Sequence, residues 1–331
     1  MDDHSTIERG GMDRRTLLRS AAALGAAAWL AGCAGTEGAA VRVTGGAPQA
    51  VDLGHWRQSA RLSAARADAA VVAHRDHVHV LGGAMRGVAA TTRHEEYDPA
   101  SDRWRLLAPL PDAVRGAGVA SGQGRIWVAG GVDAGRRAVA AVHAFEHATN
   151  AWTRLPPLPV AAAAPGLVVV EDLLVAVSGR RVWTLRIGDL GASGWTPGAP
   201  SPAPRSRSAV VALANVVHVI GGREDRQPSN RHDVYNPWSD GWFGAAPLPT
   251  ARHGAAAADL GGQAIVAGGR GWAGLTRRTE AYDRRTDLWT SLAPLPVVRA
   301  GAGAAVVDGR LHVAGGANGA GRRHDVFSRN A

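Results

Sequence analysis

The stretch that decides the fold runs from Ala264 to Pro296 and reads AIVAGGRGWAGLTRRTEAYDRRTDLWTSLAPLP. It holds short apolar runs, a glycine pair, a Tyr-Asp pair, a tryptophan and a proline-rich link. Short runs separated by Gly, Asp and Pro are typical of β-strands joined by turns, not of helices. With the residues just before it, this stretch predicts four strands, over 255–259, 264–267, 279–283 and 287–291.

The same markers recur along the whole chain of 331 residues. Six tryptophans follow one another at steps of 48, 48, 43, 47 and 47 residues: Trp56, Trp104, Trp152, Trp195, Trp242 and Trp289. Six pairs of small residues have identical steps: Gly82-Gly83, Gly130-Gly131, Ser178-Gly179, Gly221-Gly222, Gly268-Gly269 and Gly315-Gly316. Two markers with one period indicate a repeat protein, which forms a single domain despite its length.

Four-stranded units with a double glycine, a Tyr-Asp pair and a tryptophan resemble the kelch repeat, whose units form the blades of a β-propeller. The resemblance covers about residues 53–328. The last unit ends without a tryptophan, whereas Trp56 precedes the first glycine pair. We therefore expect an all-β, six-bladed kelch-type propeller over 53–331, with the N-terminal strand completing the last blade. The third unit has Ser178 in place of glycine, and it should be the least regular blade.

The first 33 residues predict an export signal and a lipid anchor. Arg14 and Arg15 precede a short apolar segment, as in a twin-arginine signal. Leu30-Ala31-Gly32-Cys33 resembles a bacterial lipobox, and Cys33 is the only cysteine of the chain; a buried or stray thiol is the alternative. Residues 34–52 predict a flexible tether. We expect a protein anchored to the outer face of the bacterial cytoplasmic membrane, with either Met1 or Met12 as its start.

The charge of the chain is strongly positive. All 37 basic residues are arginines, and the formal net charge is +9. Such an excess attracts anionic partners, although a GC-rich genome also favours arginine. The arginines are scattered and no nucleic-acid recognition motif accompanies them, so we expect no nucleic-acid partner.

Arginines precede the innermost strand of five units. They are Arg66, Arg115, Arg205 or Arg207, Arg252 and Arg299. Innermost strands line the central channel of a propeller, so the pattern predicts guanidinium groups at one channel mouth, where they would bind a carboxylate or phosphate. The alternative is that each arginine bonds backbone carbonyls and is architectural. Trp272 breaks the repeat in a loop of unit five, and we expect it to be exposed and to contribute to specificity.

Other recurring polar residues predict structural roles. His79, His218 and His312 occupy one position of the repeat that apolar residues fill elsewhere, which indicates packing between blades. His77 and His79 have a spacing that can hold a metal, but no carboxylate stands at a defined offset, so we expect no metal site. An acidic position recurs before the strand-three aromatic, and we expect structural hydrogen bonding from it; its members are Glu95, Asp233, Glu280 and Asp325.

The function predicted from these features is binding of an anionic or carbohydrate ligand, or of a partner protein, by a monomer without cofactor. The alternative is a sugar-modifying enzyme resembling sialic-acid mutarotase, which would need arginines for the sugar carboxylate and a general acid or base. Galactose oxidase-like chemistry would need a copper held by tyrosines and histidines and a cysteine cross-link. The chain has three tyrosines, all in the repeat position, and its one cysteine is the expected lipid site, so we do not expect that chemistry. No catalytic residue is assigned.

Overall fold

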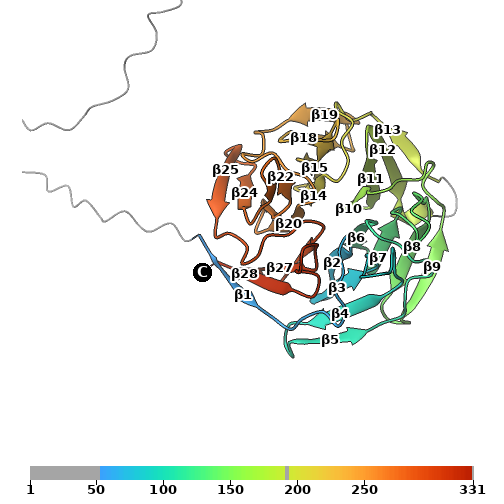
Figure 1. Cartoon of the computed structure of the whole chain (residues 1–331). Helices are drawn as coiled ribbons and strands as arrows, with labels where there is room; N and C mark the ends of the chain where they lie inside the picture. Colours follow the sequence, from blue (N-terminus) through green and yellow to red (C-terminus); the bar gives the residue numbers. More distant parts are fainter. Residues whose placement is uncertain (1–52, 191–193, 330–331) are drawn as a thin grey trace, which may run out of the picture. The chain divides into compact units, whose positions relative to one another are not determined.

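The computed structural model describes residues 53–190 and 194–329, and the predictions on Arg14, Arg15, Cys33 and the tether lie outside them. The described chain forms six four-stranded antiparallel sheets arranged as a ring (Figure 1). A single 3-10 turn at Ile187–Asp189 is the one helical element in these ranges. No helix there is long and apolar enough to cross a membrane.

Each sheet is one blade, built from the channel outwards. Blade 1 comprises β2 (Ala70–His74), β3 (His77–Leu81), β4 (His94–Asp98) and β5 (Arg103–Leu106). Blade 2 comprises β6 (Gly118–Gly122), β7 (Arg125–Ala129), β8 (Val142–Glu146) and β9 (Ala151–Leu155). Blade 3 comprises β10 (Gly166–Val170), β11 (Leu173–Ser178), β12 (Arg181–Arg186) and the short β13 (Thr196–Gly198).

The second half of the ring follows the same plan. Blade 4 comprises β14 (Ala209–Leu213), β15 (Val216–Ile220), β18 (His232–Asn236) and β19 (Gly241–Gly244), with a two-stranded arm of β16 (Arg223–Glu224) and β17 (Gln227–Pro228). Blade 5 comprises β20 (Ala256–Leu260), β21 (Gln263–Ala267), β24 (Thr279–Asp283) and β25 (Leu288–Leu292), with an arm of β22 (Arg270–Gly271) and β23 (Gly274–Leu275). Blade 6 comprises β26 (Gly303–Val307), β27 (Arg310–Ala314), β28 (His324–Ser328) and β1 (His55–Gln58).

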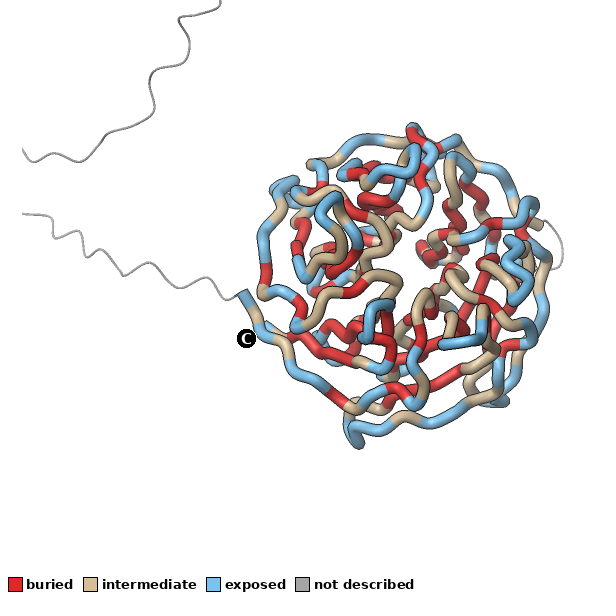
Figure 2. The backbone as a smooth tube through the Cα atoms, in the orientation of Figure 1, coloured by how far each residue is buried: buried red, intermediate tan, exposed pale blue. Residues whose placement is uncertain are grey.

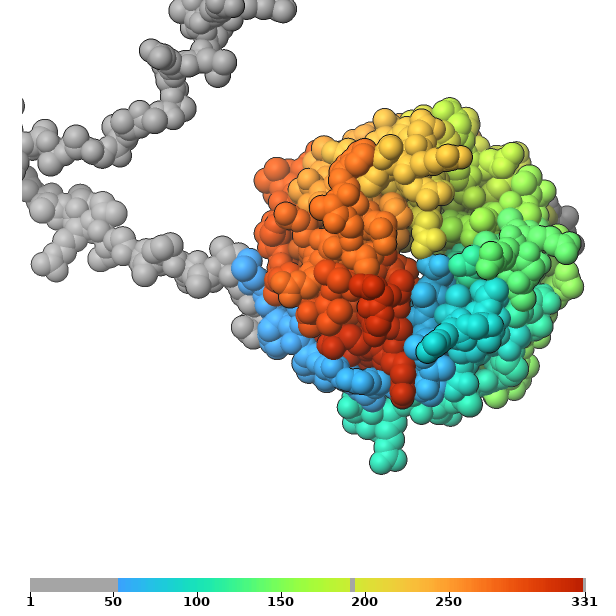
Figure 3. Space-filling model, viewed as in Figure 1, coloured from blue at the N-terminus to red at the C-terminus, as the bar shows by residue number. Residues whose placement is uncertain are grey.

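The N-terminal strand closes the ring, as the sequence predicts. β1 pairs antiparallel with β28, and Trp56 lies opposite Phe327 with 5.2 Å between the ring centroids. In the space-filling view the first described residues lie against the last blade (Figure 3). The sixth blade therefore has four strands, and the N-terminal and C-terminal strands of the propeller are joined within one sheet.

The repeated tryptophans join neighbouring blades. Each indole nitrogen donates a hydrogen bond to a carbonyl in the link that follows the outer strand of the preceding blade, which supplies the partner that a half-buried indole needs. The six bonds are Trp56 to Ala293, Trp104 to Ala60, Trp152 to Ala108, Trp195 to Pro156, Trp242 to Ala199 and Trp289 to Ala246, at 2.8–3.0 Å.

The glycine pairs allow a close approach between blades. The amide of Gly269 donates to the carbonyl of Arg299 in the next blade at 2.8 Å. A Cβ on Gly268 would lie 2.7 Å from that oxygen, and the φ of Gly268 is +68°. No larger residue fits there without displacing the neighbouring blade. The second glycines of the pairs 82–83, 130–131, 221–222 and 315–316 donate to the next blade in the same way.

Apolar side chains and paired histidines fill the spaces between blades. Buried segments follow mainly the second and third strands of the blades, and exposed segments follow the rim (Figure 2). His218 lies 2.8 Å from His232, nitrogen to nitrogen, and the His232 ring packs edge-on against Tyr282 of the next blade at 4.5 Å. Two further pairs have the same arrangement: His79 with His94 and His312 with His324. The predicted packing role of this position is therefore observed.

The histidine pairs should make folding pH-dependent. Burial lowers the pKa of His218 to about 3 and of His232 to about 4. The unfolded chain therefore takes up protons below about pH 6.5 that the folded chain does not, and stability falls as the pH drops from 6.5 towards 4. Replacing the pair by the residues of blade 5, His218→Ile with His232→Thr, should reduce the loss of unfolding free energy between pH 7 and pH 5. Urea unfolding at both pH values measures this, and an unchanged difference would contradict it.

Candidate ligand site at the channel mouth

Four of the six arginines named from the sequence are buried inside blades and do not reach the channel mouth. The Arg252 side chain is fully buried; it donates to the Glu280 carboxylate and, at 3.1 Å, to the Val266 carbonyl. Arg66, Arg205 and Arg299 bind in the same way to Glu95, Asp233 and Asp325. A guanidinium already held by a carboxylate and by carbonyls is not available to a ligand. The prediction of a five-membered ring is therefore wrong for Arg66, Arg252 and Arg299, and of the two candidates in unit four Arg205 is buried as well. The recurring acidic residues are the partners of these four arginines.

Two blades lack both members of this pair. Counting from the glycine pair, blade 2 has Val114 in the arginine position and blade 3 has Ala162. The acidic position, read from the strand register, holds His143 in blade 2 and Trp183 in blade 3. Arginine and carboxylate occur together or not at all, as expected when an unpaired buried charge is costly.

This pairing gives a stability prediction. Arg252→Ala should lower the free energy of unfolding by about 3–5 kcal/mol, because it leaves the Glu280 carboxylate buried without its partner. The double variant Arg252→Ala, Glu280→Val removes both charges of the pair and should be clearly more stable than the single variant. Urea unfolding compares the three proteins. A double variant less stable than Arg252→Ala would show that the pair is not a coupled unit.

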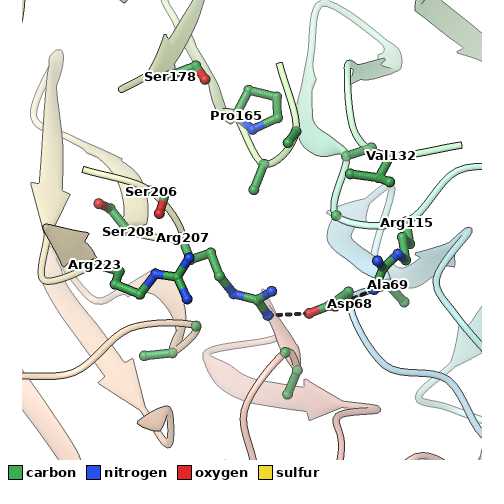
Figure 4. A pocket seen from close by; sticks show the side chains of 18 residues that line it. Asp68, Ala69, Arg115, Val132, Pro165, Ser178, Ser206, Arg207, Ser208 and Arg223 are labelled. Carbon is green, nitrogen blue, oxygen red and sulfur yellow. Dashed lines mark hydrogen bonds and ion pairs between the residues drawn. The ribbon is translucent and has the colours of Figure 1, made fainter. Parts of the chain in front are cut away.

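The remaining two predicted arginines do lie at the mouth of the channel. Arg115 and Arg207 line a pocket of about 390 Å³ together with Asp68, Arg223 and several serines (Figure 4). Arg207 Nη2 donates to Asp68 Oδ1 at 2.5 Å, and Arg115 Nη1 lies 3.6 Å from Asp68 Oδ2. Asp68 precedes blade 1 and Arg207 precedes blade 4, on opposite sides of a six-membered ring. The two side chains therefore meet across the mouth.

The backbone at this position explains why these side chains project over the mouth. Asp68 and Arg207 have φ angles of +53° and +56°, where glycine occupies the same repeat position in blades 2, 5 and 6. Inter-blade hydrogen bonds hold the conformation: the Asp68 amide donates to Gly301, and Gly254 donates to the Arg207 carbonyl. A positive φ costs a non-glycine residue about 1–3 kcal/mol, and such residues cluster at functional sites.

The mouth carries an excess of hydrogen-bond donors. Arg115 Nε and Arg207 Nε are buried and have no hydrogen-bond partner among the described residues. His253 precedes Gly254 of the pocket lining. Burial lowers the pKa of His253, and the charges of Arg207 and Arg223 lower it further. His253 is therefore neutral at pH 7 in a positive field, and the unpartnered donors suit an anionic ligand.

The irregular third blade has only a short loop at the channel mouth, between its second and third strands. In blade 3 only residues 179–180 connect the second and third strands. The corresponding connections in blades 1, 2, 4, 5 and 6 span 82–93, 130–141, 221–231, 268–278 and 315–323. Ser178, Ala163 and Ala164 line the pocket on this side, so a ligand can reach the arginines over blade 3.

Comparison with known proteins identifies the repeat. The family model described as Kelch motif matches residues 113–159 and 251–296, which contain blades 2 and 5. The chain is a six-bladed β-propeller with kelch motifs in blades 2 and 5. A solved structure, described as the structure of YjhT, superposes with a TM-score of 0.69 at 16% sequence identity, over 82% of this chain and 99% of that one. That likeness shows a shared fold. No curated protein sequence matches the chain.

Trp272 of the kelch propeller is exposed, as predicted. It lies between β22 and β23 in the arm of blade 5, with 70% of its surface accessible, and it is not among the residues that line the mouth pocket. Below the mouth, the channel is lined mainly by Ala, Val and Gly of the six inner strands. The charged side chains of the channel are therefore concentrated at the mouth, and Asp259 is the one charged residue among the described residues that line the channel below it.

Sequence reasoning missed Asp68. The sequence did contain a sign of its role, because Asp68 and Arg207 stand where three other blades have glycine. The sequence prediction also grouped Arg115 with the buried arginines. Arg115 is one residue past the buried position, which Val114 fills.

Proposed function

We propose that this kelch propeller is a binding module that captures a small anionic carbohydrate at its channel mouth. The observation that carries the proposal is that Arg115 and Arg207 share one carboxylate, that of Asp68, and that their side chains are 34% and 37% exposed, whereas the four buried arginines each have a carboxylate inside the blade. The Nε atoms of both mouth arginines also lack partners among the described residues. A ligand carboxylate would accept these donors, and guanidinium groups bind carboxylates in bidentate fashion.

The size and composition of the pocket support a sugar-sized ligand. Its volume lies within the range of about 300–1,000 Å³ that is usual for small-molecule sites. Three arginines, including the exposed Arg223, and one carboxylate line the pocket, so the mouth is net positive. Ser206 and Ser208 offer hydroxyl groups that can bond to sugar hydroxyls.

We also propose that the module is held outside the cytoplasmic membrane by a lipid on Cys33, after export directed by Arg14 and Arg15. The support is the lipobox-like sequence and the single cysteine of the chain. Cys33→Ser should move the protein from the membrane fraction to the soluble fraction; a variant that stays in the membrane fraction would refute the anchor.

Paired ligands test the site. Glucuronate and glucose differ by a carboxylate, so calorimetry should detect glucuronate binding and weak or absent glucose binding. Arg115→Ala or Arg207→Ala should weaken glucuronate binding by about 10- to 100-fold, since each removes charge-assisted hydrogen bonds of about 1.5–3 kcal/mol. Asp68→Asn should strengthen binding, because it removes the carboxylate that competes with the ligand.

Arg310→Ala is the matched control. Arg310 is an exposed arginine at the start of β27, at the end of its strand away from the mouth, so its loss lowers the net charge equally without touching the pocket. Binding that Arg310→Ala weakens as much as Arg207→Ala would reduce the effect to net charge and contradict the site.

One observation favours the alternative, a sugar-modifying enzyme. Asp68 places a carboxylate between two mouth arginines, where it could exchange a proton with a bound sugar. Exchange between the α and β anomers of glucuronate, followed by NMR, distinguishes the two functions. Acceleration by the wild type that Asp68→Asn abolishes would establish the enzyme, whereas binding without acceleration supports the module.

A further inference from the structure

A second group of polar side chains lies between blades 1 and 2, apart from the mouth. His79 on β3 stands directly opposite Glu96 on β4 in the strand register, and His147 follows the end of β8 in the next blade. His79 Nε2 and His147 Nδ1 each lie 3.4 Å from Glu96 Oε2. All three atoms lie within 4.8 Å of one another.

The three atoms are buried and lack hydrogen-bond partners among the described residues. The other polar atoms of His79 and Glu96 are engaged: His79 Nδ1 lies 3.0 Å from His94 Nε2, and Glu96 Oε1 accepts a 2.5 Å hydrogen bond from Arg105 Nε. The side chains of His79 and Glu96 are 0% and 1% exposed. Water therefore does not solvate the atoms that face one another.

The hydrogen bonds fix which nitrogen of His79 carries a lone pair. The carbonyl of Ala108 accepts from His94 Nδ1 at 3.2 Å, so the Nε2 of neutral His94 is an acceptor. His79 must then donate from Nδ1, which leaves the lone pair of Nε2 directed at the Glu96 carboxylate. Two electron-rich atoms at 3.4 Å repel each other unless a proton or a metal ion lies between them.

The residues concerned break the repeat at three positions. The position of Glu96 holds an uncharged residue in the five other blades, namely Ala144, Thr184, Val234, Ala281 and Val326. The position of His147 holds Pro99, Ile187, Pro237, Arg284 or Arg329 in the others. His74 ends β2, where the other blades have Gly, Val or Leu. The histidine pairs of blades 4 and 6 lack this carboxylate, so packing does not require it.

We propose that His79, Glu96 and His147 form a Zn²⁺ site that bridges blades 1 and 2. Two histidines and one glutamate are a donor set that zinc accepts, and bond lengths near 2.0–2.1 Å place tetrahedral ligands about 3.3 Å apart, close to the separations observed. His94 and Arg105 orient the ligands from behind, as second-shell partners do. His147 is 20% exposed and provides the route to solvent.

The fourth ligand is water or His74. The ring centroid of His74 lies 5.8 Å from that of His79, and its buried Nε2 also lacks a partner among the described residues.

Metal binding to the full chain tests the site. The chain is stripped with a chelator, incubated with excess Zn²⁺ and gel-filtered, after which elemental analysis should find one zinc per chain and melting should occur at higher temperature than for the stripped protein. Co²⁺ in place of Zn²⁺ should give the visible absorption of a tetrahedral site with nitrogen ligands. Less than a tenth of an equivalent of zinc, with no shift in melting, would overturn the proposal.

Substitutions taken from other blades locate the metal. Glu96→Val carries the residue of blades 4 and 6, and His147→Arg that of blade 5; each should weaken zinc binding by more than about 100-fold, beyond the 10- to 100-fold typical of second-shell changes. His218→Ile removes a buried histidine from the same repeat position in blade 4 and should leave binding unchanged. If Glu96→Val does not fold, His147→Arg decides alone, because that residue is partly exposed. Full zinc retention by a folded His147→Arg, or loss in His218→Ile, would refute the site.

Discussion

The pairing of β1 with β28 is the constraint on which the rest of the molecule depends. It turns a row of six sheets into a ring, and the Trp56 hydrogen bond to Ala293 continues the tryptophan contacts across the junction. In a closed ring each blade has two neighbours, so every inner strand faces the same axis. Residues that are 139 positions apart, Asp68 and Arg207, can then meet over the mouth.

The residues that repeat in several blades are architectural, whereas the residues of the two proposed sites differ from blade to blade. Tryptophans, glycine pairs, buried arginines and histidine pairs occupy the same positions in several blades and make the same contacts in each. The mouth and the blade 1–2 junction differ, because Asp68, Arg207, Glu96 and His147 stand where other blades have different residues. β2 runs from the mouth, which Ala69 lines, to His74 beside the proposed metal. The two sites thus lie towards opposite ends of blade 1 and can be perturbed independently.

Much of the fold could be predicted from the sequence, because a tryptophan and a glycine pair with one period leave few architectures. The site could not be predicted, because a difference of one or two positions in the sequence decides whether an arginine is buried or lies at the mouth. Arg205 and Arg207 are two positions apart, yet one lies inside its blade against Asp233 and the other over the mouth. Spacing from the glycine pair distinguishes them, and a count of arginines near the first strand does not. Glu96 was missed because it neighbours His79 through strand register and not through a fixed sequence offset.

The most direct test of the account is a crystal structure of the protein soaked with glucuronate. The account predicts electron density for the sugar in the mouth pocket, with its carboxylate between the guanidinium groups of Arg115 and Arg207 and with access from the side of blade 3. Density for glucuronate at another surface, with the Asp68–Arg207 ion pair unchanged and the mouth filled by water alone, would contradict it.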